Sequence, residues 1–387
     1  MTERQELWLL LGILYLAECF RWVRRGSWVF RRLYGSRWSA QPASEFIGND
    51  RGDLHWAWPF PLFGDLIVAR GLPWCVGPEG VATWHPVTRH PNGRTLQAAG
   101  FRRWEEVREV QLEGEKIFVA NELWWVADSQ VEAQRLASAL KRWAELPAKQ
   151  REAALRIELR DSFDVAAVRA RIATTTPELG LTRQIASGLW CVLFFLLPLA
   201  IWRQGWFPAL PLGLIAVYGL GGWIAWRTVR LHQTWYPRAT AERLRVRLLC
   251  WCSPLTAIRA ADLVGRNRVE SFDPLAVALA LLPGPRTAAV AGSWVRDSWF
   301  PRLPENPFPH GTPAANTVTW FTSLYQEIGT EALKTAGIDA EALRRPPAAT
   351  EACHTQYCAR CQAQYLAIAS SCQACNGRPL YPLVPVK

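Results

Sequence analysis

The sequence predicts a multi-domain α+β membrane protein with three transmembrane helices. Three observations support this prediction. Two long stretches between Ile185 and Trp226 are almost free of charge, a region of short strands and turns precedes them, and two closely spaced pairs of cysteines lie near the C-terminal end. With 387 residues, the chain is long enough for two or three domains.

A transmembrane helical hairpin is expected over residues 185–226. Arg203 is the only charged residue in this segment and divides it into two apolar stretches. Helices over 185–202 and 204–226 would be about 27 Å and about 34 Å long, so each can cross a hydrocarbon core of about 30 Å. Tryptophans stand where such spans would meet the membrane surfaces: Trp190, Trp202, Trp206, Trp223 and Trp226. A buried hairpin in a large soluble core is the alternative.

The N-terminal apolar segment, residues 7–23, is predicted to be an uncleaved transmembrane anchor. Most of the nearby arginines follow this segment rather than precede it, which differs from a secretory signal peptide. By the positive-inside rule, these arginines place its C-terminal end in the cytoplasm, and the arginines after Trp226 place both ends of the hairpin on the same side. We therefore expect the N-terminus outside and the bulk of the chain in the cytoplasm.

The remaining segments are assigned from their patterns. Residues 24–146 are expected to form a small cytoplasmic α+β domain. Its expected elements are a hairpin in 72–84, strands near 107–112, 117–120 and 123–127, and a final helix capped by Ser129 with Glu132 at capping-box spacing. A helical collar is expected over 147–184, a cytoplasmic helical region over 227–345, and a linker with a small metal-bound module over 346–387.

The order of elements over residues 66–145, a small antiparallel sheet closed by an amphipathic helix, resembles bacterial pleckstrin-homology-like domains that lie beside membrane anchors. The similarity rests on this order and on the stretch from Phe101 to Trp143. It implies a bacterial inner-membrane protein, and the excess of arginine over lysine agrees with a GC-rich bacterial genome. A generic small α+β domain is the alternative.

The strongest chemical signal is C-terminal: Cys358 and Cys361, then ten residues, then Cys372 and Cys375. Two Cys-x-x-Cys pairs at this distance can offer four thiolates to one metal ion, and such closed sites are structural. The segment resembles zinc ribbons, which implies a structural Zn²⁺ and identifies no reaction. The expected cytoplasmic location keeps the thiols reduced and available to metal.

Other candidate residues have less specific surroundings. Cys353 and His354 lie just upstream of the paired cysteines and could replace a ligand, but four thiolates already fill the coordination shell, so we expect both to be bystanders. His85 and His90 flank a loop without a supporting carboxylate pattern, and no catalytic residue is predicted. Five further cysteines are expected to be buried thiols: Cys19, Cys75, Cys191, Cys250 and Cys252.

Two features concern the membrane segments themselves. Glu18 is an acid inside an expected span, and we expect it to pair locally with Arg21 and Arg25, with a transport role as the alternative. Four glycines of the second hairpin helix are expected to allow close helix packing: Gly213, Gly219, Gly221 and Gly222.

These observations favour a binding or scaffold protein whose partners are membrane lipids and another protein. The net charge of +11 has a simple explanation in membrane topology, because the arginines are dispersed or lie beside spans, and nucleic-acid binding is therefore not expected. An enzyme acting on a membrane-associated substrate is the second hypothesis. A transporter component is the third, and three spans per chain would require an oligomer.

Overall fold

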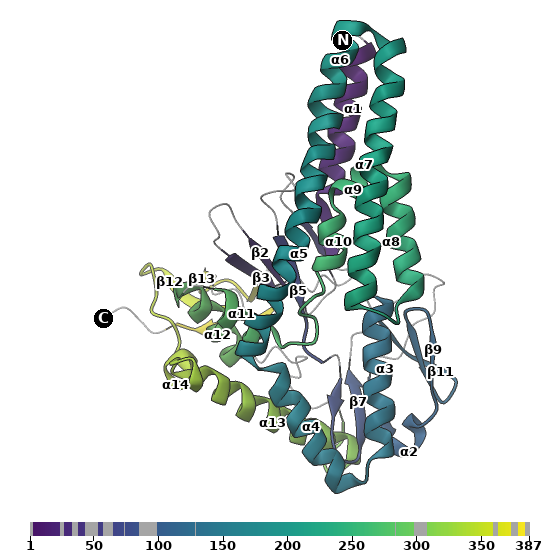
Figure 1. Ribbon diagram of the computed structural model, residues 1–387. Helices are drawn as coiled ribbons and strands as arrows, with labels where there is room; N and C mark the ends of the chain where they lie inside the picture. Colours follow the sequence, from purple (N-terminus) through teal and green to yellow (C-terminus); the bar gives the residue numbers. More distant parts are fainter. Residues whose placement is uncertain are drawn as a thin grey trace.

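The computed structural model describes residues 3–23, 27–32, 38–42, 53–56, 65–72, 74–84, 99–127, 129–282, 284–297, 308–358, 363–372 and 378–383. The described chain is a mixed α+β protein with a mostly helical middle and small antiparallel sheets. Figure 1 shows long helices rising from a base of shorter helices and sheets, with the N-terminus at the far tip. Cys361 and Cys375, two of the four predicted zinc ligands, and the loop with His85 and His90 lie outside the described residues.

The long helices form what we call the apolar bundle. It consists of α1 (Glu3–Glu18), α7 (Trp206–Trp235) and the distal part of a continuous helix composed of α5 (Val165–Cys191), the π-helical turn η1 (Val192–Leu196) and α6 (Leu197–Gln204). Within the described residues, the helices 165–204 and 206–235 are long and apolar enough to cross a membrane. The turn between them is Gly205, whose φ of 81° favours glycine.

One proline and several glycines explain local details of this hairpin. Pro198 lacks a backbone N–H and its ring would meet the carbonyl of residue 194, which accounts for the wider π-helical turn before it. A Cβ at Gly213 would lie 2.2 Å from Leu197 Cδ1, so the Leu197 side chain packs directly against this glycine. Close helix packing was also the expected role of Gly219 and Gly222. This expectation is wrong, because a Cβ at either position would meet no described atom within 4 Å.

Helix α1 is shorter than the anchor expected over 7–23. It has 16 residues, about 24 Å, and residues 20–23 instead form strand β1 (Phe20–Val23), which pairs antiparallel with β4 (Asp53–Trp56). Aromatic and β-branched residues favour a strand once a partner is present. Tyr15 lies 5.3 Å from Phe194 between ring centroids, while Trp8 packs near Ile201, so α1 runs antiparallel to the 165–204 helix. The N-terminus and the Gly205 turn therefore lie at the same end (Figure 1).

Three small antiparallel sheets lie at the other end. The first has the order β3-β2-β5, the second β6-β7-β8 and the third β11-β10-β9. Their strands are β2 (Trp28–Arg32), β3 (Trp38–Pro42), β5 (Asp65–Ala69), β6 (Cys75–Val76), β7 (Gly80–Trp84), β8 (Ala99–Arg103), β9 (Val110–Glu113), β10 (Lys116–Val119) and β11 (Glu122–Val126). The strands predicted between residues 72 and 127 are thus confirmed, with boundaries shifted by a few residues.

The predicted helices on either side of the bundle are also present. Before it lie α2 (Trp104–Val107), α3 (Gln130–Glu145) and α4 (Ala148–Ser162), and the Ser129 hydroxyl accepts the N–H of Glu132 at 3.1 Å as predicted. After it lie α8 (Thr240–Cys252), α9 (Pro254–Ile258), α10 (Ala260–Gly265), α11 (Pro274–Leu281), α12 (Gly284–Asp297), α13 (Pro313–Thr335) and α14 (Ala340–Arg344).

The cores combine segments that are distant in the sequence. One core joins the second and third sheets and α3 to α12 and α13, with Trp74, Trp143 and Phe321 fully buried. Another joins the first sheet to α5 and α11 through Phe30, Val168 and Val277. The segments before and after the apolar bundle therefore fold together, and neither buries its apolar side chains alone.

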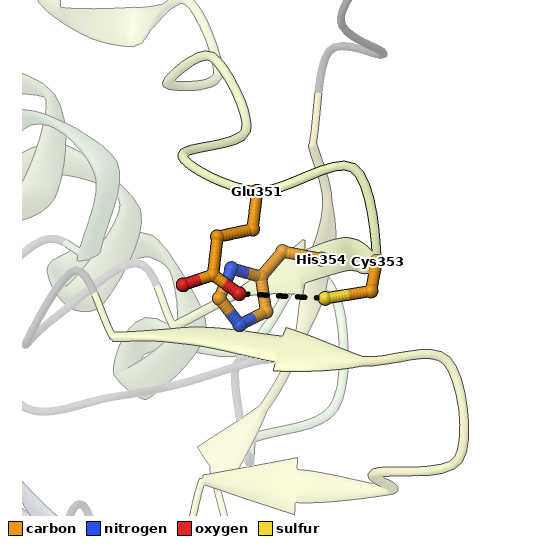
Figure 2. Close-up of side chains that lie close together, drawn as sticks. All are labelled: Glu351, Cys353 and His354. Atoms are coloured by element: carbon orange, nitrogen blue, oxygen red, sulfur yellow. Dashed lines mark hydrogen bonds between the residues drawn. The ribbon is translucent and has the colours of Figure 1, made fainter.

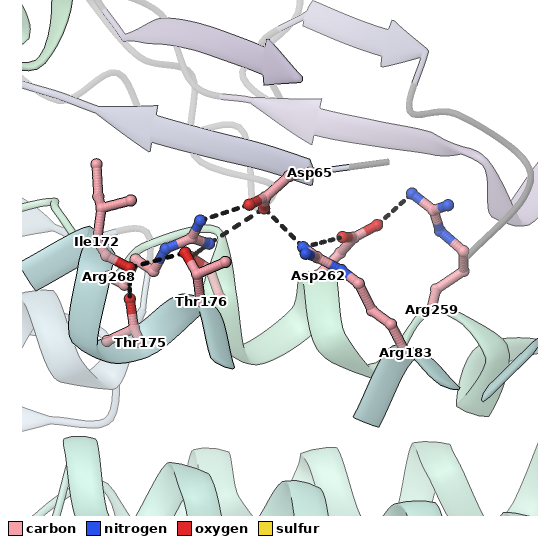
Figure 3. A network of polar contacts seen from close by, with 9 residues as sticks. Asp65, Ile172, Thr175, Thr176, Arg183, Arg259, Asp262 and Arg268 are labelled. Atoms are coloured by element: carbon pink, nitrogen blue, oxygen red, sulfur yellow. Dashed lines mark hydrogen bonds and ion pairs between the residues drawn. The ribbon is translucent and has the colours of Figure 1, made fainter. Parts of the chain in front are cut away.

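A buried ion network lies where the first sheet meets α5 and α10 (Figure 3). Arg268 Nη2 lies 2.6 Å from Asp65 Oδ2, and Arg183 Nη2 lies 2.7 Å from Asp65 Oδ1. Arg183 also faces Asp262, which pairs with Arg259. Burial alone would raise the pKa of Asp65, but the two guanidinium groups hold it at about 2, so this carboxylate is charged.

Candidate metal centre

The C-terminal module is built on short antiparallel strands. β12 (His354–Tyr357) lies between β13 (Gln364–Leu366) and β16 (Tyr381–Pro382), and β14 (Ser371–Cys372) pairs with β15 (Arg378–Pro379). This small sheet is compatible with a zinc-ribbon-like module. It lies beside α12, because the guanidinium of Arg296 stacks over the ring of Tyr357 at 5.9 Å.

Each Cys-x-x-Cys segment begins at the end of a strand. The Cys358 N–H donates to the Ala363 carbonyl at 3.0 Å, and Cys372 pairs with Arg378 between β14 and β15. Each contact joins the first cysteine of a pair to a residue a few positions after the second cysteine, as a metal knuckle requires.

Cys358 and Cys372 meet in the interior of the module. Both are fully buried and form one small cluster with Tyr365 and Leu380. The hydroxyl of Tyr365 donates to Cys372 Sγ at 3.0 Å. A donor at this distance stabilises a thiolate, which is the form that binds metal, so these residues fit a zinc site. Tyr365 belongs to no sequence motif, so the sequence alone does not assign it to the metal site.

Glu351, Cys353 and His354 form a second group of metal-binding donors (Figure 2). Their ligand atoms all lie within 4.8 Å of one another, and Cys353 Sγ donates to the Glu351 carboxylate at 3.5 Å. Glu351 and Cys353 are exposed. His354 Nδ1 lies 3.3 Å from the Thr350 hydroxyl, which leaves its Nε2 for other partners. These donors are a possible exposed metal-binding group near the buried cysteines.

The other sequence candidates are distributed over the molecule. Cys19, Cys75 and Cys250 are buried as expected, whereas Cys191 and Cys252 are exposed, so the expectation of burial is wrong for these two. Both lie on outward faces of long helices, which a short apolar sequence context does not distinguish from a core position. Glu18 accepts a hydrogen bond from the Thr256 hydroxyl at 3.4 Å, so α9 supplies a partner for this acid.

A pocket of about 280 Å³ lies between α12, α13 and α14 and is lined by Trp294, Tyr325 and Arg344, among others. Behind it, the Tyr325 hydroxyl donates to the buried carboxylate of Asp273 at 2.6 Å and accepts from the Trp294 indole at 3.2 Å. Burial raises the pKa of Asp273 to about 6 although Tyr325 and the Leu275 N–H oppose the shift. Asp273 also caps α11, so a structural role explains it.

No protein-family model, curated protein or solved structure matches this chain. The site must therefore be interpreted from its own geometry.

Proposed function

We propose that this protein is a membrane-anchored binding protein of a bacterial inner membrane, with a C-terminal module held by structural zinc. One observation carries the proposal: the apolar bundle presents large apolar side chains on its outer surface. Phe207 is 94% exposed and Ile215 is 71% exposed. Similar exposed side chains lie on all its helices: Leu9, Leu10, Ile13, Phe195, Leu196, Leu212 and Leu214. A contiguous surface of this kind marks contact with lipid or with other protein.

The charges at the base of the bundle support a membrane boundary there. Arg230 lies over the ring of Trp226 at 5.7 Å. Arg227 donates to the hydroxyl of Thr182, the residue before Arg183, at 3.1 Å, so Arg183 and Arg227 lie at a similar level of the two long helices. Tryptophan and arginine together are typical of the cytoplasmic interface. In the proposed topology, the Gly205 turn and the N-terminus lie outside and the sheets lie in the cytoplasm.

The binding role is assigned to the C-terminal module. A four-thiolate zinc site would organise the segment through Cys358, Cys361, Cys372 and Cys375, and needs no further chemistry from them. Two apolar side chains at the end of β13 and on the turn that follows it are exposed: Leu366 is 45% exposed and Ile368 is 90% exposed. Exposed apolar residues on a rigid module suit docking of a protein partner.

Affinity purification from detergent-solubilised membranes tests this proposal. The full chain should capture a protein partner that is lost from the chain truncated after Arg345 and from the Ile368→Asp variant. Thr355→Asp, which changes an exposed residue of β12, is the matched control and should retain the partner. Equal capture by all four proteins would contradict the docking role. Recovery of only further copies of the chain would favour a transporter component, and turnover of a membrane-derived substrate would favour an enzyme.

A further inference from the structure

Helix α8 turns back along α7 and exposes an apolar face at its C-terminal end. The two helices pack extensively and run antiparallel. A Cβ at Gly221 of α7 would lie 3.9 Å from the Cys250 carbonyl, which fixes the level that the end of α8 reaches. Figure 1 shows α8 beside the lower half of α7.

The end of α8 lies on the membrane side of the boundary that the arginines mark. Trp226, with Arg230 over its ring, marks the base of the apolar bundle. Gly221 lies five residues closer to the Gly205 turn, which corresponds to about 7 Å along the helix. The last turns of α8 are therefore on the lipid side of the boundary.

The side chains of α8 also differ between its start, which is charged, and its end, which is apolar. Val246 and Cys250 are buried in the same cluster as α7 residues. Leu248, Leu249 and Trp251 are exposed by 48%, 40% and 54%. Arg243 and Arg245 lie near the start of the helix, and Arg247 lies just past its middle. The end of α8 therefore exposes apolar side chains near the level at which α7 exposes Trp223 by 51%, and the arginines lie nearer the base.

The chain that leaves α8 also satisfies its polar groups within the protein. The Ser253 hydroxyl accepts the N–H of Thr256 at 3.2 Å, and Pro254 has no N–H to satisfy. The Thr256 hydroxyl lies 3.4 Å from the Glu18 carboxylate of α1. Irregular backbone at membrane depth is tolerated only where protein covers and satisfies it.

We infer that the C-terminal half of α8 re-enters the cytoplasmic leaflet, with Leu248, Leu249 and Trp251 among the acyl chains and the exposed Arg247 among anionic headgroups. This inference rests on the proposed membrane crossing of the bundle. It makes the cytoplasmic end of the membrane domain a four-helix structure, with α9 packed against α1.

Three native cysteines, all exposed in the structure, can test this inference. Cys191 lies on the 165–204 helix within the expected span, Cys252 ends α8, and Cys353 lies in the C-terminal module. The full chain is reconstituted in nanodiscs of phosphatidylcholine and phosphatidylglycerol and treated with a membrane-impermeant maleimide. Modified peptides are then quantified by mass spectrometry. Cys353 should react readily. Cys191 and Cys252 should react at rates at least about tenfold lower, because hydrocarbon excludes the reagent and disfavours the thiolate.

Two engineered cysteines on α8 provide a matched comparison. Ala241→Cys, at the exposed start of the helix, should react like Cys353, whereas Leu248→Cys should be protected like Cys191. Rapid labelling of Cys252 and of Leu248→Cys with Cys191 still protected would place α8 in water and overturn the inference, while the crossing of the bundle would stand. Rapid labelling of Cys191 as well would overturn the proposed membrane crossing itself.

Discussion

The carboxylate of Asp65 forms an ion pair with the Arg183 guanidinium, with Oδ1 and Nη2 2.7 Å apart, and this pair joins strand β5 to the helix that continues into the apolar bundle. Both side chains are buried, and Arg268 completes the contact from the segment after α10. Removing one partner from a buried pair leaves an uncompensated charge, which costs much more than the pair itself contributes.

Asp65→Asn should therefore lower the free energy of unfolding by about 3–5 kcal/mol. Urea titration of the detergent-solubilised protein, followed by tryptophan fluorescence, measures the change. Glu327→Gln is the control, because Glu327 pairs with Arg156 at 2.9 Å on the exposed surface and its loss should cost about 1 kcal/mol or less. Similar losses from the two variants would refute the importance of the buried network.

The stability of the protein should fall as pH rises from about 4 to about 6 because of Asp273. Its pKa is raised from 3.8 to about 6, so the folded state favours the protonated carboxyl, and this contribution is lost as pH rises through the folded pKa. The shift corresponds to about 3 kcal/mol over that interval. Asp273→Asn keeps the helix cap and should remove this part of the pH dependence. Asp164→Asn, at the exposed cap of α5, should leave it unchanged, and an unaltered slope in Asp273→Asn would contradict the assignment.

Reductively purified protein should contain about one zinc per chain. Replacement of Cys358 or Cys372 by serine should abolish zinc retention, whereas Cys353→Ser and His354→Ala should keep it. Tyr365→Phe should retain the metal with affinity lowered about 10–100-fold, because the hydrogen bond to Cys372 Sγ is lost. Metal analysis and competition with a chelator provide the measurements. Loss of zinc from the Cys353 and His354 variants alone would show that the exposed donors, and not the paired cysteines, bind the zinc.

Reporter fusions can determine the proposed topology. Fusions after Arg37, after Trp226 and at Lys387 should report the cytoplasm, and an insertion near Gly205 should report the outside. A C-terminal fusion that reports the periplasm would refute both the topology and the reducing surroundings expected for the cysteines.

A side chain at Gly213 should disturb the packing of α6 against α7. In Gly213→Ala, the new methyl group would overlap Leu197 Cδ1, so the Leu197 side chain must leave its present position, and we expect a loss of about 1–3 kcal/mol in stability. Gly219→Ala on the same helix would meet no described atom within 4 Å and should be neutral or slightly stabilising. Equal thermal stability of the two variants in detergent would argue against the close contact between α6 and α7.

Local patterns predicted much of this structure. The uncharged hairpin, the strands between residues 72 and 127 and the Ser129 cap each depend on neighbours within a few residues, so the sequence contains their signal. The pairing of residues 20–23 with 53–56 and the contact between Asp65 and Arg268 depend on partners far along the chain. Periodicity carries no information about such partners. The spacing of the paired cysteines predicts a metal site. The hydrogen bond from Tyr365 to Cys372 cannot be predicted in this way, because a single tyrosine belongs to no spaced motif.

The helix from Val165 to Gln204 is continuous, although its two halves have different surroundings. Its first 19 residues, up to Arg183, form an arm of about 28 Å that packs against α11 and the first sheet. A tilt of about 5° in the distal half would move the start of such an arm by about 2 Å, given its length. If the bundle crosses a membrane as proposed, a change in bilayer thickness would therefore displace the start of this arm and the cores that pack against it.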